Sequence, residues 1–294
     1  MTHQSSTRGY LLIVLAACLW ATIGLFTRQL HDLYGLSALT VVFLRAGVAF
    51  VIAFIALAIF RRKLLYFSPS RLGLLVLYGL VGISVFYFLY AQAIITTSVT
   101  TAVVLLYTAP AFVTIIAWRT WGEPLTARKL VAVGLAIVGC ALVAKAYDPA
   151  EWQLNLVGVL IGLGAGFTYA LFTVFNKAGA EKFPLGTLIT YELFFGALFL
   201  LPLQSPDAFA VMIEQPTAWV FLLGLVLGPT LGSITVFNLG LRSLPASNVS
   251  IVATIEPVVA SAIAFFVFSE RMDVLQIVGG IMVIGGALWL SLVQ

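Results

Sequence analysis

Two residues that could do chemistry stand next to each other inside an apolar run. In "IEPVV" (residues 255–259), Glu256 is an acid, and Pro257 lacks the N–H that would continue a helical hydrogen-bond ladder. A charged carboxylate near the centre of a bilayer costs at least about 2.5–3.5 kcal/mol on insertion scales. We therefore expect Glu256 to be protonated, paired with a cation, or hydrated in a cavity. These states suit proton coupling or recognition of a substrate ammonium, whereas a neutral acid that only hydrogen-bonds a neighbour is the structural alternative.

Pro257 has a counterpart earlier in the chain. In "YTAPAFV" (residues 107–113), Pro110 lies 147 residues before Pro257. The two prolines leave the backbone carbonyls of Leu106 and Ala253 without their helical donors. In lipid, such carbonyls must face protein or a water-filled cavity. The pair favours two kinked helices that border a shared cavity; bends that only improve packing are the alternative.

The segments that hold these residues have the composition of membrane helices. The chain has 294 residues, of which 62% are hydrophobic and 9% are charged, against about 25% charged in an ordinary soluble domain. Its apolar stretches are close to the roughly 20 residues that a helix needs to cross a bilayer. We predict an all-α polytopic membrane protein with ten transmembrane helices, at about 10–28, 36–60, 71–92, 97–118, 126–145, 155–176, 184–203, 217–240, 246–268 and 272–292.

Other kinds of chemistry have little support. Cys18 and Cys140 fall within predicted spans, and the chain has no CxxC, HExxH or Walker motif, so we expect no disulfide framework, metal site or cofactor. An intramembrane enzyme is disfavoured because no histidine lies in mid-span. "LAAC" (residues 15–18) resembles a lipoprotein cleavage site, but the apolar run continues to Phe26. This length favours an uncleaved first helix.

Basic residues indicate the orientation in the membrane. If the N-terminus is inside, the inner loops hold most of them, including the run at 61–63, whereas the outer loops hold Arg28, Lys145 and Arg271. The positive-inside rule then predicts that both termini are cytoplasmic. The net charge of +4 follows from this topology and does not suggest a nucleic-acid partner.

The sequence contains an internal repeat. Offsets of 147 and 149 residues superpose these pairs: Pro110 on Pro257, Glu123 on Glu270, Thr101 on Asn248, Gly139 on Gly286 and Trp20 on Tyr169. We therefore divide the chain into two five-helix repeats, residues 1–150 and 151–294. An odd number of helices makes the second repeat enter the membrane in the opposite sense. Inverted repeats are a hallmark of secondary transporters, whose substrate site lies near the midplane between the repeats.

Polar aromatic residues concentrate on the helices expected to line that cavity, at Trp20, Tyr78, Tyr87, Tyr90, Tyr107 and Tyr169. We predict that the substrate-binding residues are Trp20, Tyr78, Tyr90, Thr101, Tyr107, Tyr169, Asn248 and Glu256, with Pro110 and Pro257 as hinges. An aromatic, weakly charged cavity suits an amphipathic solute. It lacks the cluster of basic residues that a sugar phosphate would require.

The remaining membrane charges are expected to be structural. Arg45 and Glu192 lie in equivalent helices of the two repeats, and they either pair across the repeat interface or are satisfied locally. Glu123 and Glu270 each precede the next helix, where negative charge complements the N-terminal dipole.

Small residues recur four positions apart, as in Gly158, Gly162 and Gly166, and in Ala132, Ala136 and Cys140. Such rows predict close helix packing. A dimer seam formed by the helices at 126–145 and 272–292 is the alternative.

The segments "YTAPAFVTIIAWRTWGEPLTARKLVAVGLAIVG" and "IEPVVASAIAFFVFSERMDVLQIVGGIMVIGG" resemble the drug/metabolite transporter superfamily. The chain is similar over nearly its whole length to ten-helix exporters with two EamA-type repeats, and among these to bacterial aromatic amino-acid exporters. The resemblance implies a secondary exporter of aromatic and other amino acids in a bacterial inner membrane, working by alternating access. A multidrug, nucleoside or purine exporter is the alternative. Expected partners are a small-molecule substrate and the lipid bilayer, with proton coupling left open, in a monomer or weak homodimer.

Overall fold

The computed structural model describes residues 3–151, 155–269 and 271–291. Within these ranges the chain is helical and contains no strand. The first half comprises α1 (His3–Ala21), α2 (Ile23–Tyr34), α3 (Ala38–Phe60), η1 (Arg62–Leu65), η2 (Pro69–Arg71), α4 (Leu72–Gly79), η3 (Leu80–Val85), α5 (Phe86–Thr96), α6 (Val99–Leu106), α7 (Ala109–Trp121) and α8 (Ala127–Val143).

The second half follows the short helix η4 (Pro149–Glu151). It comprises α9 (Leu156–Lys182), α10 (Leu185–Leu200), η5 (Leu201–Leu203), α11 (Pro206–Glu214), α12 (Ala218–Leu225), η6 (Val226–Gly232), α13 (Ser233–Leu241), α14 (Ala246–Ala253), α15 (Ile255–Phe268) and α16 (Val274–Ser291). Of these, α11 is a short helix between two predicted spans. Glu270 lies outside the described residues.

The ten predicted membrane segments all correspond to helical stretches. Nine helices in the described ranges are long and apolar enough to cross a membrane. The segment predicted at 126–145 corresponds to α8, which has 17 residues, at the lower limit for a spanning helix. The structure therefore confirms the fold class of a polytopic helical membrane protein.

The residues that cap the ends of corresponding helices are similar in the two halves. Thr126 accepts a hydrogen bond from the N–H of Lys129 at the start of α8, and Asp273 accepts one from the N–H of Gln276 at the start of α16. The preceding helices end at Gly122 and Ser269, which have positive φ angles of 66° and 57°. Glycine adopts this left-handed conformation freely, whereas the serine does so only as a helix cap.

Two predicted helices are interrupted beside their prolines. α6 ends at Leu106 and α7 begins at Ala109, just before Pro110. Likewise, α14 ends at Ala253 and α15 begins at Ile255, two residues before Pro257. Threonine hydroxyls satisfy one carbonyl at each break: Thr108 donates to Leu105 over 2.6 Å, and Thr254 donates to Ile251 over 2.6 Å. Movement of the prolines as hinges stays a prediction.

Two π-helical segments occupy corresponding places in the halves. They are η3, between α4 and α5, and η6, between α12 and α13. η3 packs against α9 and α10, and η6 packs against α1 and α3. Because π-helical turns often occur at functional sites, the region that η3 and η6 border is a candidate functional site.

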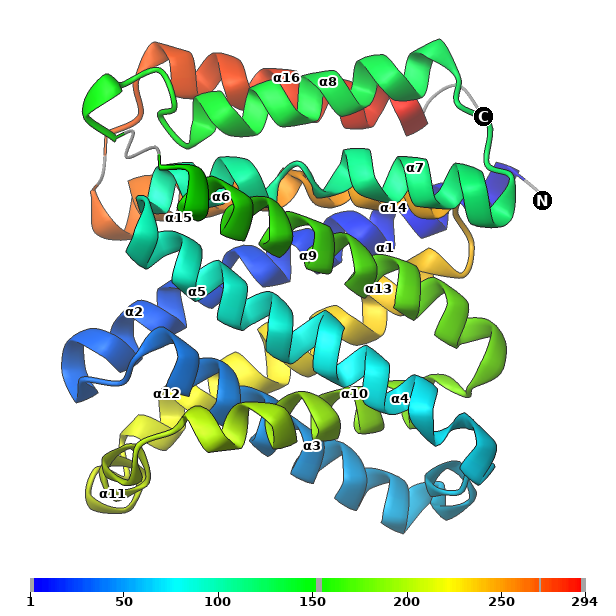
Figure 1. The fold of residues 1–294 in the computed structure, drawn as a ribbon, viewed down its shortest axis with the longest axis vertical. Helices are drawn as coiled ribbons and strands as arrows, with labels where there is room; N and C mark the ends of the chain where they lie inside the picture. Colours follow the sequence, from blue (N-terminus) through cyan, green and yellow to red (C-terminus); the bar gives the residue numbers. More distant parts are fainter. Residues whose placement is uncertain (1–2, 152–154, 270, 292–294) are drawn as a thin grey trace.

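Rows of small residues bring helices together as predicted. α8 lies along α16 at one edge of the molecule (Figure 1). A Cβ atom placed on Gly139 would lie 2.7 Å from the carbonyl oxygen of Gly279. On α9, a Cβ on Gly166 would lie 2.6 Å from the carbonyl oxygen of Leu105. These faces are packing surfaces within the chain, which leaves the facing sides of α8 and α16 unavailable as a dimer seam.

The first long helices of the two halves, α1 and α9, run in opposite directions. In Figure 1, α1 runs from right to left and α9, the first helix of the second half, from left to right. The start of α1 and the end of α16 lie on the same side of the molecule. An inverted repeat requires this relation between α1 and α9, and the inverted arrangement of the complete halves stays a prediction.

Candidate functional site

A cavity of about 600 Å³ lies between the two halves. The first half contributes lining residues from α1, α2, α3, η3, α5, α6 and α8, and the second half contributes residues from α9, α10, η6, α13, α15 and α16. The lining includes Val99, which is 61% exposed, and the exposed residue Lys145. The cavity therefore reaches the surface at the side where α6 and α16 begin.

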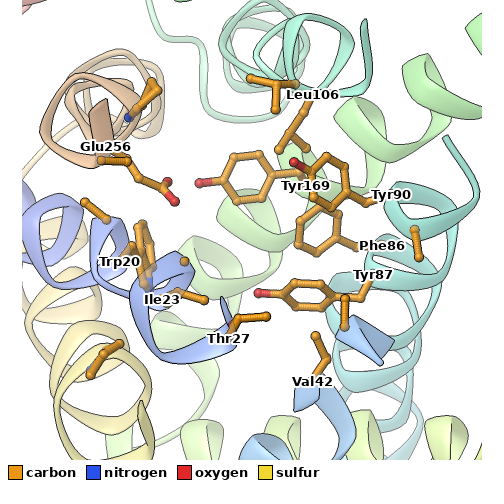
Figure 2. Close-up of a pocket in the computed structure, with 18 of the residues that line it drawn as sticks. Trp20, Ile23, Thr27, Val42, Phe86, Tyr87, Tyr90, Leu106, Tyr169 and Glu256 are labelled. Carbon is orange, nitrogen blue, oxygen red and sulfur yellow. The ribbon is translucent and has the colours of Figure 1, made fainter. Parts of the chain in front are cut away.

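Aromatic rings form much of the cavity wall. Phe86 of α5 stacks on Tyr169 of α9, with ring centroids 5.1 Å apart. Trp20 of α1 packs on Phe237 behind the wall, with centroids 4.9 Å apart. Tyr87 and Tyr90 lie on the same side of α5 as Phe86 (Figure 2). The wall can therefore contact an apolar or aromatic solute while offering hydroxyl groups.

Arg45 of α3 places a cation in this wall. Its side chain is 8% exposed and lines the cavity. The guanidinium donates a hydrogen bond to the hydroxyl of Tyr87 and lies 4.8 Å from the centroid of the same ring. Within the part of the chain that the structure describes, no carboxylate forms an ion pair with Arg45. Its remaining donors are therefore available to an anion in the cavity.

Glu256 places an acid in the same cavity. It lies in the first turn of α15, directly after the break in the helix. Figure 2 shows its carboxylate and the hydroxyl of Tyr169 pointing toward one another. Arg45 acts on Glu256 electrostatically, yet no ion pair joins them in the described residues. The cavity therefore contains one cation, Arg45, and one acid, Glu256, that do not form an ion pair with each other.

The end of the molecule away from the opening is closed by polar contacts, which we call the inner seam. The amine of Lys177, on α9, donates to the carbonyl oxygens of Leu241 and Leu244 over 2.7 and 2.8 Å. A cation is favourable here because helix carbonyls at a C-terminus lack partners. Beside it, Asn248 donates to the hydroxyl of Tyr10 over 2.7 Å.

Glu123 belongs to the inner seam as well. Its carboxylate accepts a hydrogen bond from the N–H of Ala246 over 2.6 Å, and it accepts both the N–H and the hydroxyl of Ser247. It also pairs with Lys129 over 3.2 Å. The sequence interpretation assigned Glu123 to the dipole of the next helix in the chain. It instead caps α14 of the other half, because α7 and α14 pack together.

Most of the predicted site residues come together in the cavity wall. Trp20, Tyr90, Tyr107, Tyr169, Glu256 and Pro257 line the cavity, and contact of these residues with a substrate stays a prediction. Pro110 lies outside the cavity and borders a small void of about 10 Å³ nearby.

Three predicted residues are placed elsewhere. Tyr78 stacks on Phe175, with centroids 4.8 Å apart, because η3 changes the helical phase between Tyr78 and the residues of α5. Thr101 is fully buried in the first turn of α6, where its N–H bonds to Ser98. Asn248 lies in the inner seam. These three positions do not line the cavity.

Arg45 is the site residue that the sequence interpretation missed. It was expected to pair with Glu192 or to be satisfied locally, and no Arg45–Glu192 pair is present in the described residues. The available signal was its charge in mid-span, which makes a residue in a membrane helix a candidate functional position.

These features define a multi-pass helical membrane protein with a cavity of a size that suits a small solute, since ligand pockets measure about 300–1,000 Å³. The EamA-like transporter family model matches residues 7–145 and 156–292. The chain belongs to the EamA-like transporter family, as the resemblance implied.

Similar proteins agree with this assignment. An uncharacterized transporter of Archaeoglobus fulgidus is 29% identical over 94% of this chain and 93% of the relative. A protein of Streptantibioticus cattleyicolor named "Probable terminal-alkyne amino-acid exporter" is 25% identical over 95% of this chain and 92% of that protein. A solved crystal structure matches with a TM-score of 0.78 at 15% identity, covering 96% of both chains, which shows the fold alone.

Proposed function

We propose that this transporter is a secondary exporter of small amphipathic amino acids. The observation that carries the proposal is the presence of Arg45 and Glu256 in one aromatic-walled cavity without an ion pair between them. A zwitterion with an apolar side chain presents matching groups. Its carboxylate would bind the guanidinium of Arg45, and its ammonium would bind the carboxylate of Glu256.

The chemistry of each group supports these roles. A guanidinium can hold a carboxylate by two parallel N–H···O bonds, and charge-assisted bonds are about twice as strong as neutral ones. The rings of Trp20, Phe86 and Tyr169 would pack against the side chain of the amino acid. The lining has no further buried cation, since Lys145 is exposed at the cavity's mouth. A phosphorylated substrate, which needs several basic residues, is therefore disfavoured.

The closed inner seam supports alternating access. The cavity opens at one side of the molecule, while Lys177 and Glu123 hold the opposite side shut. The positive-inside rule assigns the seam to the cytoplasmic side, so this conformation would face outward in a bacterial inner membrane, with both termini in the cytoplasm. The named exporter of Streptantibioticus cattleyicolor supports amino acids as the class. Because one chain supplies all cavity walls, a monomer would suffice.

The proposal can be tested by transport into liposomes that contain the purified chain. Vesicles loaded with unlabelled phenylalanine should take up radiolabelled phenylalanine by exchange, and protein-free vesicles should not. Uptake should be inhibited by tryptophan and leucine, and weakly by phenylalanine amide or 3-phenylpropionate, each of which lacks one of the two charges. Absence of exchange across a panel of amino acids would contradict the proposal. Exchange of a lipophilic cation or a nucleoside in its place would identify the multidrug or nucleoside alternative.

A further inference from the structure

Glu192 of α10 is a buried acid that the proposed substrate site does not use. Its side chain is fully buried, with 0% exposure. One carboxyl oxygen, Oε1, accepts a hydrogen bond from the amide of Asn176 over 3.0 Å. The other, Oε2, is buried and has no hydrogen-bond partner among the described residues. An ionised carboxylate with one neutral donor would be expensive at this position, because a buried charge requires a partner.

No cation compensates for this acid among the described residues. The elements packed against α10 include α3, α4, η1, η3, η5, α9 and α13. Their titratable residues, with Tyr191 of α10 itself, are Arg45, Arg62, Lys63, Tyr78, Tyr169, Lys177, Glu181 and Lys182. Arg45 forms no ion pair with Glu192 in the described residues, and Lys177 is bonded to two backbone carbonyls. The remaining cations lie at the exposed ends of η1 and α9. A proton is therefore the available way to neutralise Glu192.

The hydrogen bonds around Glu192 are also compatible with a protonated carboxyl group. The side-chain amide of Asn176 donates one hydrogen bond to Glu192 and one to the carbonyl of Phe172. The oxygen of the Asn176 side chain is buried and lacks a donor among the described residues, as does Glu192 Oε2. Both oxygens are acceptors when Glu192 is ionised. Protonation would give the carboxyl group a hydrogen to donate, which removes part of the cost of two orphaned acceptors.

The position of Glu192 connects the cavity with the inner seam. A Cβ atom on Gly82 of η3 would lie 3.7 Å from Glu192 Oε1, and Gly82 lines the cavity. On the other side, Asn176 directly precedes Lys177, the residue that closes the seam. Glu192 is thus separated from the cavity by a glycine without a side chain, and its hydrogen-bond partner is the chain neighbour of the residue that closes the seam.

We propose that Glu192 is a proton-binding site that couples export to proton entry, a proposal that rests on the proposed exporter function. In the conformation described, with the cavity open and the seam closed, Glu192 carries a proton received through the cavity. When the seam opens, water reaches Asn176 and the carboxylic acid releases that proton to the opposite side. One proton would enter for each substrate that leaves, and the carboxylate would be protonated again after the cavity reopens.

Transport driven by a pH gradient tests the coupling. With the membrane potential held near zero by potassium and valinomycin, because the exchange moves one net charge, wild-type vesicles should concentrate phenylalanine by up to about tenfold for each pH unit imposed across the membrane. Glu192→Gln should retain phenylalanine exchange and lose this accumulation. Glu192→Asp, which keeps an acid, should retain accumulation at a lower rate. Glu181→Gln, a change of an exposed acid at the end of α9, is the matched control and should behave as wild type. Accumulation in Glu192→Gln equal to wild type would overturn the proposal.

A second measurement does not depend on any substrate. Infrared spectra of the purified chain near neutral pH should contain a carbonyl band from protonated carboxylic acid that Glu192→Gln loses and Glu181→Gln retains. If wild-type protein shows the band but no amino-acid exchange, the exporter assignment fails while the proton site stands. If exchange is present and the band is unchanged in Glu192→Gln, the proton site fails while the exporter assignment stands.

Discussion

The amine of Lys177 lies 2.7 Å from the carbonyl oxygen of Leu241, and this contact joins the end of α9 to the end of α13 on the closed side of the molecule. A second carbonyl, that of Leu244, shares the same amine. Hydrogen bonds to a charged group each contribute about 1.5–3 kcal/mol. The contact is therefore strong enough to influence which side of the transporter is open.

Lys177→Gln should open the inner seam more often. A cysteine at Leu244, which is 2% exposed, would report opening on a background that lacks Cys18 and Cys140. In inside-out vesicles, we expect Lys177→Gln to raise the rate of maleimide labelling by about tenfold or more, in line with the loss of at least one charged hydrogen bond. Lys182→Gln, at the exposed end of the same helix, should leave the rate unchanged. Equal rates in the two variants would show that Lys177 does not hold the seam.

The close approach of α8 and α16 should make one glycine intolerant of a side chain. A Cβ on Gly139 would meet the carbonyl of Gly279 at 2.7 Å, whereas a Cβ on Gly134 would meet nothing within 4 Å. We expect Gly139→Val to lower the thermal midpoint in detergent, because overpacking costs about 1–3 kcal/mol. Gly134→Ala should leave the midpoint unchanged or raise it, because alanine favours a helix. A similar midpoint for both variants would contradict the packing of these helices.

The contact between Tyr147 and Asp273, outside the membrane spans, should depend on pH. The phenol of Tyr147 donates to the carboxylate of Asp273, which lowers the pKa of Asp273, and the N–H of Gln276 adds to the effect. A carboxyl group whose pKa is lowered by folding stabilises the protein above its unfolded pKa, about 3.9, and loses this contribution as the pH falls through the folded value.

Asp273→Asn should therefore lower the thermal midpoint by a constant, small amount between about pH 5 and 8. Asparagine keeps the helix cap, so the loss reflects the charge. The difference from wild type should shrink below about pH 4. Tyr147→Phe should show the same trend. A difference that grows toward acid pH would contradict this assignment.

The fold could largely be predicted because its main determinants are local. Apolar length and the requirement for helices in lipid determined the ten segments, and the residues around Pro110 and Pro257 predicted where two of them break. Rows of small residues such as Gly158 and Gly162 predicted close packing. The π-helical segments at Leu80–Val85 and Val226–Gly232 could not be predicted, because these spans are apolar on all sides and carry no periodic signal.

The candidate site could be predicted only in part. Trp20 and Tyr169 lie in the cavity wall, in keeping with their superposition by the repeat. Tyr78 faces a different cluster because the π-helix η3 rotates α5 relative to α4. The capping partners of Glu123 lie on α14, distant in sequence, and Glu192 bonds to Asn176 on the preceding helix instead of to Arg45. Repeat symmetry does not specify which helix contacts which. The contacts of Glu123 and Glu192 follow from how the helices pack in three dimensions.

The orientation in the membrane can be tested by labelling. Single cysteines in the loops at 119–129 and 269–273, without Cys18 and Cys140, should differ in their access to an impermeant maleimide. In intact cells, we expect labelling at 269–273 and protection at 119–129, because the loop at 119–129 carries the excess of basic residues. Labelling of both loops from outside would contradict the inverted arrangement of the two halves.

The central claim, that Arg45 and Glu256 recognise a zwitterion, is tested most directly by calorimetric binding of paired ligands. The purified wild-type chain should bind phenylalanine at least about tenfold more tightly than phenylalanine amide, because the amide lacks the carboxylate that Arg45 holds. Arg45→Gln should bind the two ligands with nearly equal affinity, while Arg61→Gln, outside the cavity, should retain the wild-type ratio. A wild-type chain that binds both ligands equally, or an Arg45→Gln variant that still prefers phenylalanine, would contradict the account.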